Sequence, residues 1–403
     1  MPPIPPFDLA DPRFKADPYP TYARLREEAP VHRTRLGRRR GAWLLARYDD
    51  VDALLRDPRF AKNPANARGE GGRGDAIWMP GFLRPLTRNM LDLDAPDHTR
   101  LRALVQKAFT PRMVEAQRPR IHALVDELLG RARRGGKIEL VSEFALPIPL
   151  TIISELLGVP PADQQRFHRW TTRILSASGP ADVAGLLPSV WMLFRYLRRL
   201  FAARRAEPRD DLITALVQAE EAGDKLDEDE LLGMVFLLLA AGHETTVNLI
   251  GSAALVLVRH PEQAAALRGD PGMIRTAVEE LARFTSPVEL ATERYAREDL
   301  ALHGVPIRRG EMVLGVIGAA NRDPAHFAAP DALDLSREPN RHLAFGIGAH
   351  YCVGAPLARL ETQIALAALL ERAPDLRLAA APDALRWRKH AFLRGLRELP
   401  LAF

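Results

Sequence analysis

The most informative residue of this 403-residue chain is its single cysteine, Cys352. Glycines surround it at Gly346, Gly348 and Gly354, and a helix-forming run begins directly after it. Glycine adopts backbone conformations that other residues avoid, and it lets a flat ligand approach closely. Backbone N–H groups in such a turn, and the positive end of the following helix, favour a thiolate over a thiol. The spacing therefore predicts a thiolate that ligates a metal.

One thiolate restricts which metal centre is possible. A structural zinc site needs four protein ligands, and His350 together with Cys352 does not complete that set. A disulfide within the chain is impossible because there is one cysteine. Haem iron suits a lone thiolate, because the porphyrin supplies the equatorial ligands. The alternative is a small apolar residue buried in a glycine-rich turn, and the glycine spacing argues against it.

The residues around the cysteine resemble the haem-binding signature of the cytochrome P-450 superfamily. The matching pattern is Phe345-Gly346-x-Gly348-x-His350-x-Cys352-x-Gly354, and residues 355–361 are similar to the following helix in soluble bacterial members. The resemblance extends from about residue 19 to the C-terminus. It implies haem b (iron protoporphyrin IX) as the cofactor, with Cys352 as the metal ligand. It also implies the cytochrome P-450 fold in a single large domain, residues 1–403.

A second motif, Ala-Gly-His-Glu-Thr-Thr at residues 241–246, lies within the long apolar run 231–258. Glycine and β-branched hydroxyl residues are poor choices inside a helix, and a buried carboxylate is costly. The resemblance implies that Glu244 and Thr245 are a catalytic acid–alcohol pair that delivers protons to dioxygen. It also implies that Gly242 leaves room for dioxygen. The alternative is a buried helix with incidental polar residues.

Two further motifs contain charged residues at helical spacing. Glu280 and Arg283 share a helix face, and as an exposed pair they would contribute only a few tenths of a kcal/mol. The resemblance implies instead a buried pair that reaches Arg337 and acts as a structural clamp for the cysteine loop. His98 and Arg102 also share a face, and cationic side chains suit the haem propionates. The implied cofactor-binding set is His98, Arg102, Arg294, Phe345, Gly346, His350, Cys352 and Gly354.

The bulk composition argues against several function classes. With 56 basic and 51 acidic residues the net charge is +5, and no basic block is interleaved with aromatics, so we expect no nucleic-acid binding. The N-terminus lacks the features of a signal peptide, and the apolar run 231–258 carries polar residues at its centre. We therefore expect no membrane anchor. A single cysteine is consistent with a reducing compartment, and we expect a cytoplasmic monomer.

The pattern along the chain predicts a mainly α protein with a smaller β-rich region. Asp227 followed by Glu230 is a helix-start signal before the apolar run. Gly304 and Gly310 punctuate the later strands. Expected helices span residues 22–28, 49–55, 98–108, 111–133, 162–175, 231–258, 262–267 and 273–284, and expected strands span residues 41–46, 291–296, 300–302 and 312–318.

Substrate contacts are expected from the variable segments, whose side chains are mostly apolar. This favours a medium to large lipophilic substrate, such as a terpenoid, steroid, fatty acid or macrolide-type product of secondary metabolism. The glycine-rich stretch of residues 63–74 indicates a flexible lid. The alternative is that many of these residues are ordinary core. The candidates are Trp78, Met79, Phe82, Leu83, Leu239, Ala240, Val288, Leu290 and Phe392.

Three hypotheses for the function follow. The resemblance implies a haem-thiolate monooxygenase that hydroxylates or epoxidises a lipophilic small molecule. No flavin or iron–sulfur signature is present, so electrons are expected from NAD(P)H through a ferredoxin reductase and ferredoxin. The alternatives are a peroxide-driven peroxygenase and a non-catalytic haem-thiolate protein that binds a ligand. The presence of Glu244 and Thr245 argues against both alternatives.

Overall fold

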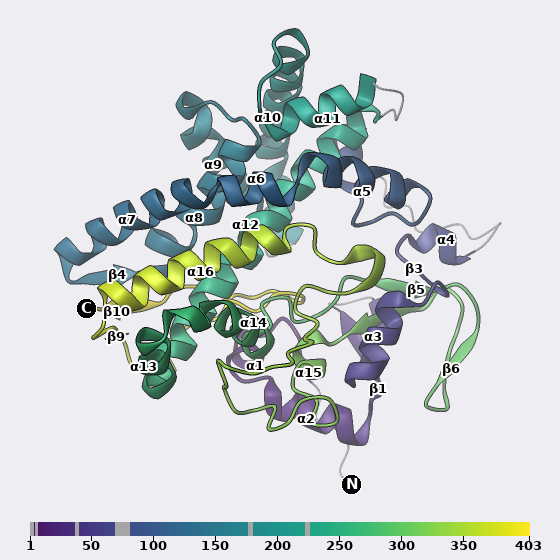
Figure 1. The fold of residues 1–403 in the computed structure, drawn as a ribbon. Coiled ribbons are helices and arrows are strands. Elements are labelled where there is room, and N and C mark those ends of the chain that lie inside the picture. The colour runs from purple at the N-terminus through teal and green to yellow at the C-terminus, as the bar shows by residue number, and fades with distance from the viewer. Residues whose placement is uncertain (1–3, 5–6, 37–39, 69–80, 176–179, 222–225) are drawn as a thin grey trace. The chain divides into compact units, whose positions relative to one another are not determined.

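Helices dominate the fold and the strands are short, as the sequence predicts (Figure 1). The structure is a computed structural model that describes all residues except 1–3, 5–6, 37–39, 69–80, 176–179 and 222–225. The chain divides into two compact units. The first unit contains residues 1–72, 118–147 and 245–403, and the second contains residues 73–117 and 148–244. That the chain is a single domain stays a prediction.

Helices α14 and α16 are central to the first unit. The buried face of α14 carries Ala277, Val278 and Leu281 at helical spacing. Helix α16 packs against α7, α13 and α14, and Figure 1 shows it in yellow beside α7. The helices of this unit are α1 (Pro12–Ala16), α2 (Tyr19–Glu28), α3 (Tyr48–Arg56), α4 (Pro64–Arg68), α7 (Arg118–Gly135), α13 (Pro261–Gly269), α14 (Ile274–Thr285), α15 (Ile317–Ala320) and α16 (Ala355–Arg372), with the short turns η2 (Val141–Ala145), η3 (Pro271–Met273), η4 (Gly348–His350) and η5 (Pro382–Ala384).

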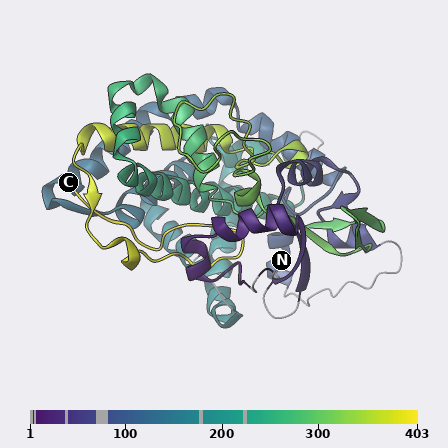
Figure 2. The same cartoon turned by 90° about the horizontal axis from the view of Figure 1, so that it is seen from below.

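The strands of the first unit form three small sheets. The largest has the order β1-β2-β8-β5-β3, in which β2 and β8 are parallel and the other pairs antiparallel. It joins purple N-terminal strands to green strands from later in the chain (Figure 2). The strands are β1 (Val31–Leu36), β2 (Arg40–Leu45), β3 (Phe60–Ala61), β5 (Arg294–Ala296) and β8 (Met312–Gly315) in this sheet, β4 (Lys137–Glu139), β10 (Pro400–Ala402) and β9 (Arg377–Leu378) in the second, and β6 (Leu300–Leu302) and β7 (Val305–Ile307) in the third.

The hairpin of β6 and β7 explains the glycine at position 304. His303 and Gly304 form its two-residue loop with φ angles of 50° and 78°. A two-residue hairpin turn of the type that matches strand twist requires positive φ at both positions, which glycine adopts without strain. The structure therefore confirms the prediction that Gly304 separates two of the later strands.

The described residues of the second unit form helices and connecting loops and no strands. Within it α9 packs against α10, α10 against α11, and α11 against α5. Its elements are η1 (Gly81–Thr87), α5 (Asp97–Ala108), α6 (Pro111–Ala116), α8 (Pro147–Leu156), α9 (Pro161–Leu175), α10 (Pro180–Ala206) and α11 (Leu212–Glu221), together with the first part of α12 (Glu228–Arg259).

The long helix α12 begins where the sequence predicts. The Asp227 side chain accepts from the Glu230 N–H at 2.8 Å, and the Glu230 side chain accepts from the Asp227 N–H at 3.1 Å. This reciprocal pair is a capping box. Among the described residues α12 is the one helix long and apolar enough to cross a membrane, and 61% of its most apolar window is buried inside the structure. Length and composition are weak evidence for a span, because a buried core helix has the same properties.

Three predicted elements differ from the structure, one of them being the strand expected over residues 291–296, which begins only at Arg294. The helix expected over residues 111–133 is split at Gln117 into α6 and α7. Thr110 caps α6 by accepting from the Met113 N–H at 3.2 Å, and Pro119 has no N–H for a continuous helix. The strand expected to run to residue 318 ends at Gly315, and α15 follows at once.

Candidate functional site

Cys352 lies in a closed loop directly before α16, and its thiol is exposed. Its backbone N–H donates to the Phe345 carbonyl oxygen at 2.9 Å. Gly346 and Gly348 have φ angles of 67° and 74°, in the left-handed region. A Cβ at Gly348 would also lie 3.0 Å from the Leu55 carbonyl oxygen. Gly346 and Gly348, two of the three glycines that the sequence singled out, are therefore needed for the shape of the loop.

The start of α16 gives the sulfur an electropositive neighbour. Gly354 is the N-cap of this 18-residue helix, and a Cβ placed there would lie 3.9 Å from the Cys352 Sγ. The positive end of a helix dipole favours an anionic group close to it. An exposed thiol in this position suits a thiolate ligand for a flat cofactor.

A network around Glu279 holds the cysteine loop from both sides. Arg359 of α16 donates to the two carboxylate oxygens of Glu279 at 2.6 and 2.8 Å. The His342 Nε2 lies 3.1 Å from the same carboxylate. The Arg359 guanidinium stacks 4.3 Å above the Phe345 ring centroid and also donates to the Tyr351 hydroxyl at 2.9 Å. Sequence reasoning missed Glu279 and His342.

The surroundings of Glu279 stabilise its ionised form. Burial alone would raise its pKa, but hydrogen bonds from His342 and Arg359 and the charges of both residues lower the pKa to about 2. An unfolded glutamate has a pKa of about 4.3. Because the folded pKa is the lower one, this carboxylate stabilises the fold above about pH 4.3, and the stabilisation is lost as the pH falls toward 2.

We expect a Glu279→Gln variant to be less stable than the parent protein by about 2–3 kcal/mol at neutral pH, because each pKa unit corresponds to about 1.4 kcal/mol. The difference in melting temperature between the two proteins should narrow as the pH falls from about 5 toward 3. Thermal unfolding, monitored by circular dichroism across this pH range, measures the difference in melting temperature. Glu262→Gln, at an exposed position, is the matched control. A difference that does not change with pH would contradict the assignment.

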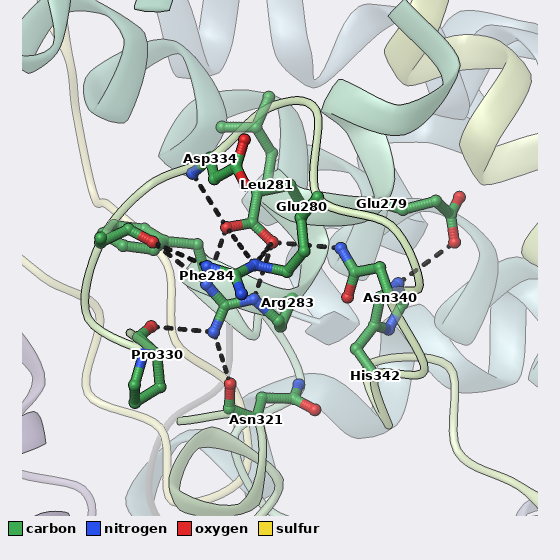
Figure 3. Close-up of polar contacts among 12 residues, drawn as sticks. Glu279, Glu280, Leu281, Arg283, Phe284, Asn321, Pro330, Asp334, Asn340 and His342 are labelled. Atoms are coloured by element: carbon green, nitrogen blue, oxygen red, sulfur yellow. Dashed lines mark hydrogen bonds and ion pairs between the residues drawn. The ribbon is translucent and has the colours of Figure 1, made fainter. Parts of the chain in front are cut away.

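The predicted clamp residues lie together, and Figure 3 shows Glu280 and Arg283 of this cluster. Glu280 and Arg283 are completely buried and form two hydrogen bonds of 2.7 Å. The Arg337 Nε donates to the Glu280 carboxylate at 3.1 Å. Two more donors, the Asp334 N–H and the Asn340 side-chain amide, reach the same carboxylate at 3.1 Å. Glu280 therefore holds the segment 334–340, which precedes the cysteine loop.

Arg283 extends this cluster to the loop itself. It donates to the carbonyl oxygens of Asn321 and Pro330 at 2.7 and 2.9 Å. The Asn321 side chain in turn accepts from the Leu343 N–H at 2.8 Å. Asn321 and Asn340 were not foreseen from the sequence, because nothing in their local pattern shows which tertiary partner they meet.

The other residues predicted to bind the cofactor or transfer protons lie in both units. His98 is buried on α5 in the second unit, and Arg102 is on the same helix. Arg294 is buried at the start of β5 in the first unit, where its guanidinium also donates to the Thr292 carbonyl oxygen at 3.2 Å. Glu244 is the last residue of the second unit, and Thr245 is the first residue of the segment 245–403 that belongs to the first unit. Both residues are half-buried on the continuous helix α12. Their roles stay predictions.

The structure describes some of the residues that were predicted to contact substrate. Trp78 and Met79 lie outside the described residues, as do residues 69–74 of the predicted lid. Val288 and Phe392 are half-buried, and Leu290 is completely buried in a core cluster that includes Tyr22 and Leu314. In the second unit Leu239 is buried, and the half-buried residues are Phe82, Leu83 and Ala240.

Comparisons with known proteins agree with one another. A family model described as cytochrome P450 matches residues 190–270 and 272–373. Cytochrome P450 107B1 of Saccharopolyspora erythraea is 50% identical over 393 residues, covering 97% of this chain and 96% of that protein. The chain belongs to the cytochrome P450 family. The solved structure of the polyketide synthase cytochrome P450 PksS of Bacillus subtilis matches with a TM-score of 0.91 and 44% identity, over 98% of this chain and 99% of that chain. A myxobacterial cytochrome P450, CYP267B1 in complex with myristic acid, matches with a TM-score of 0.90 and 43% identity, over 98% of each chain.

Membership confirms the predicted cytochrome P450 fold and the activity class. Relatives of this P450 are named monooxygenases and hydroxylases, and its class is that of an oxidoreductase that incorporates oxygen. A haem held by a cysteine thiolate is the cofactor of such proteins. The Cys352 loop is where this chain offers a thiol with suitable surroundings.

Proposed function

We propose that this P450 binds haem b through the thiolate of Cys352 and inserts one oxygen atom of dioxygen into a lipophilic product of secondary metabolism. The observation that supports this is the closed loop with its exposed thiol at the N-terminus of α16. The haem, when bound, supplies the site at which dioxygen is activated, and thiolate ligation favours cleavage of the O–O bond. His98, Arg102, Arg294 and His350 would hold its propionates by charge-assisted hydrogen bonds.

In this proposal the chain moves protons through two neighbouring side chains of α12. Glu244 is half-buried, so its carboxylate can exchange protons with water. The Thr245 Oγ1 would accept a hydrogen bond on one side and donate on the other, which orders the proton path.

We expect a Thr245→Ala variant to bind haem and consume dioxygen while forming less product per NAD(P)H, by roughly tenfold or more, because a positioned proton donor contributes about 10²–10⁴ in rate. Released peroxide should rise in proportion. Thr246→Ala, at a buried neighbouring position, is the matched control. If the ratio of product to peroxide in Thr245→Ala equals that of the parent protein, Thr245 has no part in proton delivery.

The substrate class rests on two kinds of support. The half-buried candidates are apolar in each unit, Val288 and Phe392 in the first and Phe82 and Leu83 in the second, and apolar side chains favour lipophilic ligands. One relative is named for polyketide biosynthesis, and one solved relative is in complex with myristic acid. We therefore propose a fatty-acyl or macrolide-type substrate, processed in the cytoplasm by a monomeric enzyme.

The test is a screen of macrolactones, fatty acids, steroids and terpenoids for a shift of the haem Soret band on binding. Compounds that bind are then incubated with NADPH, ferredoxin reductase and ferredoxin, or with peroxide alone. We expect a product with one added oxygen atom that depends on the reductase and ferredoxin. Product from peroxide alone would instead indicate a peroxygenase, and binding without product a ligand-binding protein.

We propose an acidic ferredoxin as the electron donor, because its negative charge would be attracted to basic side chains on the surface of this chain. Lys107 and Arg112 are exposed.

We expect Lys107→Glu and Arg112→Glu to slow the first electron transfer by several-fold at low salt, because charge complementarity raises association rates. Stopped-flow reduction under carbon monoxide measures this rate, and added salt should remove the difference. Arg199→Glu, exposed on α10, is the control. Rates that respond to neither salt nor charge reversal would mean that the donor docks elsewhere.

A further inference from the structure

Three charged side chains are buried together in the first unit, and none belongs to the proposed haem or proton-transfer set. Lys15 of α1 is 0% exposed, Glu289 is 1% exposed and Arg394 is 7% exposed. Charged groups at this depth are rare unless paired. Their burial therefore indicates a structural or functional role, and the chain segments that they connect indicate which role it is.

Lys15 joins two segments that are far apart in the sequence. Its ammonium donates to the Glu289 carboxylate and also, at 3.2 Å, to the Ala391 carbonyl oxygen. Arg394 completes the junction, because its guanidinium donates to the carbonyl oxygens of Lys15 and Ala16 at 2.8 and 3.2 Å. The end of α1 is thus fastened to the segments around residues 289 and 391–394, and Figure 2 shows the yellow C-terminal segment near the purple N-terminal helices.

These segments are also bonded to each other through the backbone. The N–H groups of Glu289 and Leu290 both donate to the Phe392 carbonyl oxygen, at 2.9 and 3.2 Å. The Arg394 N–H donates to the Pro287 carbonyl oxygen at 2.9 Å, and Val288 forms an isolated bridge with Leu393. Residues 287–290 and 391–394 therefore form one paired element, here called the paired segment. It carries Val288 and Phe392, the half-buried substrate candidates.

The packing around Glu289 leaves it little freedom. A Cβ added at Gly318 would lie 3.3 Å from the Glu289 Cγ and 3.2 Å from the Tyr22 ring. Burial and the charge of Glu289 raise the pKa of Tyr22 well above its usual value, and burial lowers the pKa of Lys15 despite the charge of Glu289. The carboxylate is thus enclosed by α2, α15 and Lys15, and its position fixes that of the backbone next to it.

We propose that the buried Lys15–Glu289 ion pair, anchored by Arg394, positions the paired segment and thereby determines which carbon of a lipophilic substrate is oxidised. Lys15 and Glu289 are positioning residues, because they act through Val288 and Phe392. The proposal rests on the proposed function in one respect, the assignment of Val288 and Phe392 to substrate contact. A change on α1 would then alter the product without touching the haem set.

The test uses full-length holoenzyme and three variants: Lys15→Met, Glu289→Gln and the double variant Lys15→Met/Glu289→Met. Lys389→Met removes an exposed charge near the same segment and is the matched control. Hydrogen–deuterium exchange is followed in peptides that cover residues 286–294 and 389–396. Myristic acid is the probe for binding, by its Soret shift, and for the ratio of hydroxylated regioisomers.

We expect Lys15→Met and Glu289→Gln to exchange at least about tenfold faster in these peptides, with no change in peptides of the cysteine loop. The regioisomer ratio should shift at least threefold while the reduced carbon monoxide spectrum stays that of the parent. The double variant removes both buried charges, so it should load haem normally even where a single variant does not, and it should keep the altered ratio.

Two results would overturn the proposal. Parent-like exchange in the double variant would show that the ion pair does not hold the paired segment. Faster exchange with an unchanged regioisomer ratio would show that the segment does not direct oxidation. If the parent protein neither binds nor oxidises myristic acid or any macrolactone, the proposed substrate class fails instead, and the exchange measurement still decides the positioning role.

Discussion

A Cys352→His variant is expected to lose the strongly red-shifted Soret band that the reduced carbon monoxide complex shows when a thiolate ligates haem iron. Imidazole is neutral and cannot supply the electron density of a thiolate. Monooxygenase turnover should fall to the background of the assay. The loop geometry supports this expectation, since the Cys352 sulfur is the thiol at the N-terminus of α16.

The control for this variant is Tyr351→Phe. Tyr351 neighbours the cysteine and is exposed, and its hydroxyl accepts from Arg359 at 2.9 Å. Its loss should leave the red-shifted band in place. A Cys352→His protein with the spectrum of the parent would refute the assignment of the ligand, and with it the proposed function.

The second large effect is expected at the clamp. A Glu280→Ala variant leaves Arg283 completely buried without its carboxylate, and breaking a buried pair in this way costs about 3–5 kcal/mol. It also removes the acceptor that holds the segment 334–340. We expect little haem in the purified protein, measured as the ratio of Soret to protein absorbance, and a large fall in melting temperature.

Asp52→Ala is the comparison for the clamp. Asp52 pairs with Arg56 on the exposed side of α3 at 3.0 Å, and exposed pairs contribute about 0–1 kcal/mol. The haem content and melting temperature of Arg337→Met should lie between those of Glu280→Ala and Asp52→Ala, because the Glu280–Arg283 ion pair remains when Arg337 is replaced. Normal haem content in Glu280→Ala would mean that the cluster has no role in holding the cysteine loop.

Local signals explain which parts of the fold could be predicted. The start of α12 follows from the spacing of Asp227 and Glu230, because a capping box involves only neighbouring residues. The shape of the cysteine loop follows from glycines at positions where φ is positive. Strand β1 was missed because its residues, Val-His-Arg-Thr-Arg-Leu, are mostly polar.

Site residues whose positions depend on tertiary contacts could be predicted only from the resemblance to the family, and some of them could not be predicted. The spacing of Glu280 and Arg283 allows an exposed pair as well as a buried one, and only the fold places Arg337, Asp334 and Asn340 around the carboxylate. Glu279 gave no signal of its own, because its partners lie 63 and 80 residues away.

The two neighbouring carboxylates of α14 couple the position of this helix to the position of the Cys352 sulfur. Glu280 holds the chain before the cysteine loop, and Glu279 holds His342 at the loop's start and Arg359 beyond its end. A small displacement of α14 would therefore carry both ends of the loop in the same direction, so the loop would translate without opening. If Cys352 holds the haem iron as proposed, substitutions in the buried face of α14, far from Cys352 in the sequence, offer a way to shift its sulfur by fractions of an ångström and so to adjust the reduction potential of that iron.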